Sequence, residues 1–134
     1  MKILVIDGQG GNLGKQLCKM LLERLPNAKI RAVGTNSLAT ESMLKTGISE
    51  AATGENAVIV GAKWADIIIG PIGIVIADAL LGEVTSKMAT AVGSAEAKRI
   101  LIPMNKCDTI VAGIDNIPTS SLIENAVQKI ISYT

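Results

Sequence analysis

The sequence predicts a three-layer α/β domain in which a mostly parallel sheet carries helices on both faces. Short aliphatic runs alternate along the chain with longer stretches of helical spacing. The runs are continuous, as is typical of parallel strands that are covered on both sides. The 134 residues suffice for one such domain, and no second domain is expected. The chain is therefore predicted to be a single Rossmann-like domain over residues 1–134.

The first half of the chain predicts three strand and helix pairs. Leu13, Leu17 and Leu21 recur at helical spacing after the first aliphatic run, and Pro26 ends that helix. The expected strands are residues 3–6, 29–33 and 48–51, and the expected helices are residues 13–25, 38–45 and 57–64. This order is the βαβ arrangement of a parallel sheet.

The second half continues the alternation without an internal repeat. Strands are expected at residues 66–69, 99–103 and 109–112, and helices at residues 74–81, 86–97 and 118–131. Pro118 suits the first turn of the last helix, where proline is tolerated. Ile123, Val127 and Ile130 give that helix an apolar face.

Composition limits the partners of the protein. Hydrophobic residues make up 49% of the chain and charged residues 19%, which predicts a folded protein. The formal net charge is +1, from 13 basic and 12 acidic residues, and the aromatic residues are Trp64 and Tyr133. Because such a surface neither attracts nucleic acid nor stacks its bases, no nucleic-acid partner is expected.

Neither a membrane span nor export is expected. The longest apolar stretch, residues 67–81, is interrupted by Pro71 and Asp78 and falls short of the roughly 18 residues that a spanning helix needs. The apolar N-terminal run is too short for a signal peptide, so the expected location is cytoplasmic. Cys18 and Cys107 have no metal-ligand spacing and the chain has no histidine, so no metal site is expected. Cys18 is expected in the core.

A glycine-rich loop between the first strand and the first helix indicates a ligand. Gly8, Gly11 and Gly14 form a G-x-x-G-x-x-G pattern at a helix N-terminus, where free N–H groups and the helix dipole favour an anion. The expected ligand contacts here are Gly8, Gln9, Gly10, Gly11, Asn12, Leu13 and Gly14. Replacing Gly11 by aspartate is expected to abolish anion binding and to leave the fold largely intact.

The loop matches neither of two common phosphate-binding motifs. The strict G-x-G-x-x-G fingerprint from Gly8 would need glycine in place of Leu13, and a P-loop ending at Gly14 would need glycine in place of Gln9. Two interpretations stay open: the glycines cradle an anion, or they only permit a tight turn and close packing. Asp7, which would repel a phosphate, either orients the loop or meets a metal ion.

Polar and glycine-bearing loops also follow other predicted strands. They contribute the candidate ligand contacts Thr35, Asn36, Thr53, Gly54, Glu55, Asn56, Gly70, Pro71, Ile72, Gly73 and Asn105. The carboxyl ends of parallel strands share one edge of a sheet, so these residues are expected to face one crevice. Each group has a structural alternative as a turn or a helix cap. The acidic residue that takes the ribose hydroxyls in NAD-binding domains is missing after the second strand.

Four motifs carry a family resemblance: Ile6-Asp7-Gly8-Gln9-Gly10-Gly11, Gly34-Thr35-Asn36, Thr53-Gly54-Glu55-Asn56 and Gly70-Pro71-Ile72-Gly73. In this combination they resemble an uncharacterised family of short bacterial Rossmann-like proteins, a domain of unknown function. The likeness extends over nearly the whole chain, to about residues 103–105, and implies the fold without a reaction. The glycine pattern alone is also distantly similar to nucleotide-sugar and reductase domains.

The leading functional hypothesis is a nucleotide- or dinucleotide-binding protein with its phosphates on the glycine loop. NAD(P) or another nucleotide is then the cofactor, and the partner is a small anionic molecule. The alternative is a noncatalytic metabolite-sensing or interaction module that self-associates. Its homodimer interface would be the apolar stretch from Ile74 to Leu81, which equally suits the core.

Overall fold

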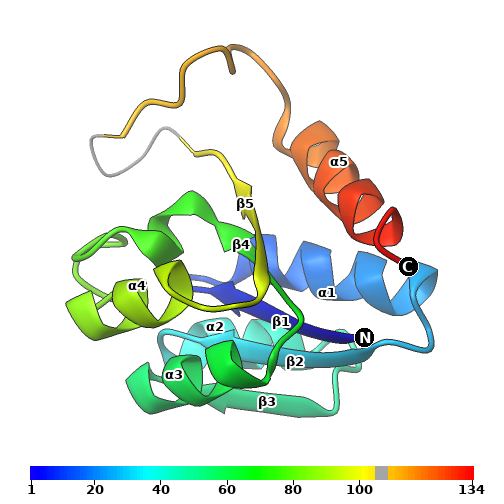
Figure 1. Ribbon diagram of the computed structural model, residues 1–134, viewed down its shortest axis with the longest axis horizontal. Coiled ribbons are helices and arrows are strands. Elements are labelled where there is room, and N and C mark those ends of the chain that lie inside the picture. The colour runs from blue at the N-terminus through cyan, green and yellow to red at the C-terminus, as the bar shows by residue number, and fades with distance from the viewer. Residues whose placement is uncertain (105–108) are drawn as a thin grey trace.

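A computed structural model describes residues 1–104 and 109–134 of the chain. The described residues form one parallel sheet of five strands in the order β3-β2-β1-β4-β5 (Figure 1). The strands are β1 (Lys2–Asp7), β2 (Lys29–Gly34), β3 (Glu50–Thr53), β4 (Ile67–Pro71) and β5 (Lys98–Ile102). Every neighbouring pair is parallel. The predicted α/β class is confirmed.

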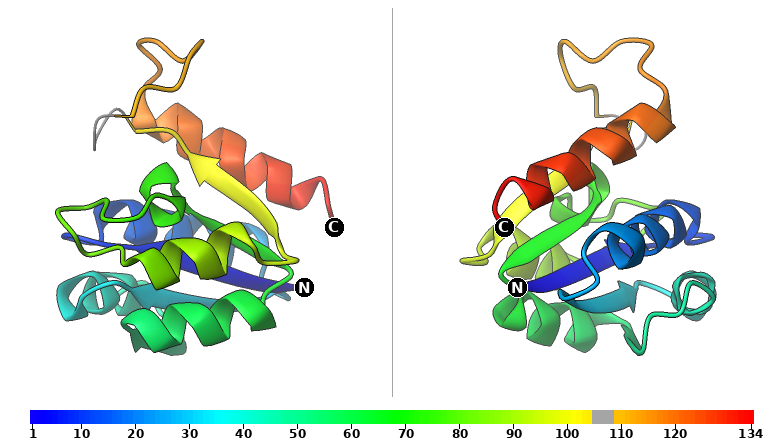
Figure 2. Two further views of the ribbon diagram at one scale, coloured as in Figure 1. Left: turned by 60° about the vertical axis from the view of Figure 1, so that its left-hand side comes forward. Right: turned by 90° about the vertical axis from the view of Figure 1, so that its right-hand side faces the viewer.

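Helices cover both faces of the sheet. In the described part of the chain they are α1 (Asn12–Arg24), α2 (Ser37–Leu44), α3 (Glu55–Trp64), the short 3₁₀ helix η1 (Ile72–Val75), α4 (Ser86–Gly93) and α5 (Thr119–Ile131). Helices α1 and α5 lie on one face and α3 and α4 on the other, which gives three layers (Figure 2). None of the helices in the described ranges combines the length and hydropathy that crossing a membrane requires.

The central strand β1 shows why continuous aliphatic runs predict this fold. Ile3 and Val5 pack in the core cluster that contains residues of α1 and α5, whereas Leu4 and Ile6 pack in the cluster that contains residues of α3 and α4. All four side chains are buried. Successive side chains of a strand point to opposite faces, so a strand that is covered on both faces must be apolar at every position.

The helix predicted at residues 74–81 is wrong. Only η1 is helical there, and residues 76–85 form an irregular segment that we call the Glu83 loop. Residues 78, 80, 81 and 82 have φ values between 56° and 86°, so the backbone is left-handed at these positions. Ile74 and Leu80, which belong to this apolar stretch, are nevertheless buried. Of the two interpretations of the stretch, a homodimer interface or part of the core, the second therefore holds for these two residues.

Two further details of the prediction are wrong. Residues 109–112 form no strand, and the chain from residue 109 runs outside the sheet to the start of α5 (Figure 1). A short apolar run does not by itself specify a strand partner. Helix α4 ends at Gly93 instead of residue 97, and in the segment that follows the guanidinium of Arg99 donates a hydrogen bond to the Ala95 carbonyl at 2.7 Å.

Candidate functional site

A cavity of about 310 Å³ lies at the carboxyl edge of the sheet, at the ends of β1 and β4. The chain leaves β1 toward β2 on one side, whereas it leaves β4 toward β5 on the other side. Open α/β sheets place their ligands where the winding direction reverses in this way. The cavity is lined by Asp7, Gly8, Gln9, Gly10, Gly11, Asn12, Leu13, Gln16, Pro71, Leu80, Met104 and Thr119.

The cavity brings together most of the predicted glycine loop. Residues 8–13 line it, and Pro71 from the end of β4 joins them. Sequence reasoning missed Gln16, Leu80, Met104 and Thr119, which belong to no motif. Met104 follows β5, so the general rule for strand ends was the available signal for this residue, whereas Thr119 begins α5 and had no such signal.

Other predicted residues lie at the same edge but outside the cavity lining, namely Gly14, Thr35, Asn36, Thr53, Gly54, Glu55, Asn56, Gly70, Ile72 and Gly73. Several of them hold the loops together. The Thr53 hydroxyl shares a 2.7 Å hydrogen bond with that of Thr40, and the Glu55 carboxylate accepts one from the Thr85 hydroxyl at 2.6 Å. Asn105 lies outside the described residues, as does Cys107.

Asp7, the last residue of β1, orients the glycine loop. The residue is 6% exposed, and its carboxylate accepts hydrogen bonds from Gly8 N at 2.8 Å and from Gly14 N at 2.6 Å. Gly14 is the third residue of α1, so the carboxylate also caps the helix. Of the two roles considered for Asp7, the geometry therefore supports orientation of the loop.

Cys18 lies in α1 and is fully buried, as predicted. Burial, and to a smaller extent the negative charge of Asp7, raises the pKa of its thiol to about 12. The thiol therefore stays protonated at neutral pH. Since the thiolate is the reactive form, Cys18 acts as a core residue and not as a nucleophile.

The glycine loop keeps three backbone amides available. Gly11 N donates to Gly8 O at 2.9 Å and closes a tight turn. The amides of Gly10, Asn12 and Leu13, in contrast, have no acceptor within residues 1–104 and 109–134. Asn12 and Leu13 are the first residues of α1, where the helix dipole adds partial positive charge. An anion in the cavity therefore meets three donors at a positive helix end.

Glu83 holds the loops after β1 and β2 together. Its Oε1 atom accepts hydrogen bonds from Gln9 N at 2.8 Å, from Thr35 Oγ1 at 2.7 Å and from Asn36 Nδ2 at 2.7 Å. All three donors are predicted ligand contacts, and in this structure each of them donates a hydrogen bond to the Glu83 side chain. Sequence reasoning missed Glu83 because it lies 74 positions from Gln9 and belongs to no motif.

The Glu83 loop holds strained backbone beside the cavity. Leu80 and Leu81 both have φ of 56°, a conformation that costs a residue with a Cβ atom about 1–2 kcal/mol. Asp78 N donates to Val84 O at 2.7 Å and closes the base of the loop. Leu80 is buried in the cavity wall, whereas Leu81 is 94% exposed. Strain of this kind persists where surrounding contacts fix the backbone, and it is common at functional sites.

The hydrogen bonds to Glu83 predict a pH-dependent loop. Burial acts to raise the pKa of the carboxyl group, but the donors Gln9, Thr35 and Asn36 outweigh it and hold the pKa below the ordinary 4.5. The stabilisation is therefore complete above pH 4.5 and is lost as the pH falls through the lowered pKa. We expect the Gln9 amide resonance in an NMR titration to shift with a midpoint below 4.5. A midpoint above that value contradicts the hydrogen-bonding scheme.

Two neighbouring glycines of the loop differ in what they tolerate. Gly11 has φ of 75°, and a Cβ atom there would lie 2.7 Å from the Cα atom of Ala39. This geometry argues against the expectation that Gly11→Asp leaves the fold largely intact. Gly10 is exposed, and a Cβ atom there would meet nothing within 4 Å. Gly10 is thus the position where a side chain tests the cavity without disturbing the fold.

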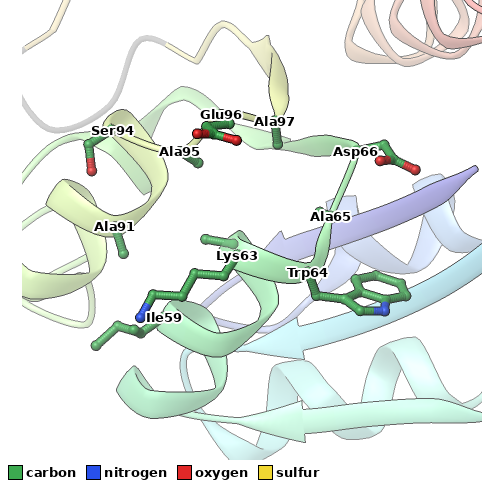
Figure 3. Close-up of a pocket in the computed structure, with 11 residues that line it drawn as sticks. Ile59, Lys63, Trp64, Ala65, Asp66, Ala91, Ser94, Ala95, Glu96 and Ala97 are labelled. Atoms are coloured by element: carbon green, nitrogen blue, oxygen red, sulfur yellow. The ribbon is translucent and has the colours of Figure 1, made fainter.

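A larger cavity of about 670 Å³ lies at the opposite edge of the sheet, between the C-terminal parts of α3 and α4 (Figure 3). The sequence predicted none of its lining, which consists of Ile59, Ala62, Lys63, Trp64, Ala65, Asp66, Ala91, Ser94, Ala95, Glu96 and Ala97. The charged side chains of Lys63, Asp66 and Glu96 do not point toward one another in Figure 3. Ligand sites usually need a few convergent polar groups, so we place the candidate site at the smaller cavity.

Comparison with known proteins gives the family and supports the fold. A family model described as a domain of unknown function (DUF3842) matches residues 2–134. The chain belongs to the DUF3842 family. No curated protein matches the DUF3842 chain.

Among solved structures, the DUF3842 chain is similar to a dodecameric FMN-dependent UbiX-like decarboxylase from Escherichia coli O157:H7. The TM-score is 0.50 and the sequence identity is 19%, and the match covers 97% of this chain and 76% of the other. At this identity the likeness shows the fold alone. It agrees with the α/β architecture described above.

Proposed function

We propose that the DUF3842 chain binds a phosphorylated small molecule of the nucleotide type in the cavity at the ends of β1 and β4. The observation that carries this proposal is the set of available amides at Gly10, Asn12 and Leu13, which border the cavity at the start of α1. A phosphate needs such donors, and a helix N-terminus adds partial positive charge. The position at the reversal of winding supports the same proposal.

FMN is the first nucleotide to test. A solved structure of similar fold is described as FMN-dependent, and its dodecameric state also makes self-association of the DUF3842 chain worth measuring. Leu13, Leu80 and Met104 give the cavity an apolar wall for a ring system, while the amides take the phosphate. The cavity, at about 310 Å³, falls at the lower end of the roughly 300–1,000 Å³ that is usual for ligand pockets.

The variant Gly10→Asp tests the proposal. The new carboxylate adds a negative charge to the loop that lines the cavity, and repulsion between two unit charges ~4 Å apart costs about 4 kcal/mol at an effective dielectric constant of about 20. We therefore expect FMN binding, measured by isothermal titration calorimetry, to weaken by at least about 100-fold. The fold is expected to persist, because a Cβ atom at Gly10 meets nothing within 4 Å.

Two controls separate charge from shape and from position. Gly10→Asn has the same size without the charge, and we expect it to retain most of the affinity for FMN. Gly93→Asp adds the same charge at the end of α4, where a Cβ atom also meets nothing within 4 Å, and is expected to leave FMN binding unchanged. Wild-type affinity in a folded Gly10→Asp protein contradicts the proposal. So does a wild-type protein that binds none of FMN, AMP, FAD and NAD⁺.

A further inference from the structure

A dinucleotide needs more of the crevice than this chain leaves open. In dinucleotide-binding folds, one nucleotide lies over the end of the second strand, where an acidic side chain takes the ribose hydroxyls, and the pyrophosphate lies at the first helix. The molecule therefore crosses the glycine loop from the β2 side to the β4 side. In the DUF3842 chain the described cavity lining includes Pro71 of β4 and no residue of the loop after β2.

The β2 side is filled by the Glu83 loop. Gln9, Thr35 and Asn36 direct their hydrogen bonds to Glu83, and Asn36 Nδ2 also donates to Gln9 O at 2.9 Å. Side chains of the loop after β2 and of the Glu83 loop also pack tightly against the backbone of Gly8. A Cβ atom on Gly8 would lie 2.5 Å from Thr35 Oγ1 and 2.9 Å from Glu83 Oε1. No room for a ribose is left between these loops.

The donors that stay available fit a single phosphate group. The amides of Gly10, Asn12 and Leu13 provide three N–H groups, and a phosphate monoester has three terminal oxygens. A second phosphate toward β2 would need the amides that precede Gly10. Those amides are engaged, because Gly8 N donates to Asp7 and Gln9 N donates to Glu83.

We infer that the site selects a mononucleotide, and that Glu83 excludes dinucleotides by closing the β2 side of the crevice. This inference rests on the proposed function and gives it a ligand class. Glu83 contacts Gln9, Thr35 and Asn36 on the β2 side and does not belong to the described lining of the cavity that would hold the mononucleotide. It is therefore a specificity-determining residue.

Two matched ligand pairs test the inference: FMN against FAD, and AMP against NAD⁺. Each dinucleotide contains its mononucleotide partner and adds a second nucleotide, so the ratio of dissociation constants isolates the added half. We expect calorimetry to show that the wild type binds the mononucleotide of at least one pair about tenfold tighter or more. Glu83→Ala is expected to reduce this ratio to about threefold or less, because Gln9, Thr35 and Asn36 become available.

Two further variants serve as controls. Glu83→Gln keeps an oxygen acceptor in the same place and is expected to keep most of the wild-type ratio. Glu96→Ala removes an exposed carboxylate at the opposite edge and is expected to keep all of it. Dinucleotides that bind the wild type as tightly as their mononucleotides in both pairs overturn the inference and leave the proposed function intact. An unchanged ratio in a folded Glu83→Ala protein also overturns it.

The wild-type ratio decides the question if Glu83→Ala does not fold. If none of FMN, FAD, AMP and NAD⁺ binds to the wild type, the proposed function fails and the inference fails with it.

Discussion

Replacing Asp7 by alanine is expected to lower the free energy of unfolding by about 3 kcal/mol, measured by urea denaturation with circular dichroism. The residue is 6% exposed, and its carboxylate accepts the amides of Gly8 and Gly14 at 2.8 and 2.6 Å. Alanine deprives both amides of this acceptor, and a hydrogen bond to a charged group contributes about 1.5–3 kcal/mol. Asp7→Asn is expected to cost about 1–2 kcal/mol, because only its carbonyl oxygen accepts.

Asp66→Ala is the matched control for Asp7→Ala. The Asp66 carboxylate also accepts a backbone amide, from Lys2 N at 2.8 Å, but it does so at an exposed position. Water replaces the lost acceptor there, so we expect a change within about 0.5 kcal/mol. Equal losses in the two variants contradict the role of Asp7 as the internal anchor of the glycine loop.

The sheet could be predicted from the sequence because its causes are local. Ile3, Leu4, Val5 and Ile6 are apolar since both faces of β1 are covered, and this pattern is visible in any short window of sequence. The end of α1 is equally local, because the helix stops at Arg24, just before Pro26. The position of the site followed from the order of strands and helices.

The Glu83 loop could not be predicted, because its causes are distant in sequence. Thr35 and Asn36 fix Glu83 from 48 and 47 positions away. The left-handed backbone at Leu80 and Leu81 has no mark of its own in the sequence, since Leu is not a residue that favours it. The missing acid after the second strand argued against NAD binding. In the structure Glu83 places a carboxylate beside the end of β2. This carboxylate accepts hydrogen bonds from Gln9, Thr35 and Asn36 of the protein itself.

Gly11→Asp is expected to destabilise the protein by about 3 kcal/mol or more, measured by thermal and urea unfolding. A residue with a Cβ atom pays about 1–2 kcal/mol for a left-handed backbone, and Gly11 has φ of 75°. The Cβ atom would also lie 2.7 Å from Cα and 2.8 Å from O of Ala39. These are backbone atoms, which cannot rotate away, and overpacking of this kind adds about 1–3 kcal/mol.

Gly11→Ala separates these effects from charge. Alanine has the same Cβ atom without a carboxylate, so a comparable loss of stability is expected. Gly10→Asp, one position earlier, is expected to change the free energy of unfolding by no more than about 0.5 kcal/mol. A Gly11→Ala protein as stable as the wild type contradicts the close contact between the glycine loop and α2.

The comparison of Gly11 variants with Gly10→Asp shows whether the G-x-x-G-x-x-G pattern serves packing or ligand binding. The three glycines of the pattern each face a neighbour that a Cβ atom would strike: Thr35 for Gly8, Ala39 for Gly11 and Met43 for Gly14. Gly10, which stands outside the pattern, faces open space at the cavity. If Gly11→Ala loses stability while Gly10→Asp loses only FMN binding, the pattern serves packing. The glycine outside the G-x-x-G-x-x-G pattern is then the one that leaves room for a ligand.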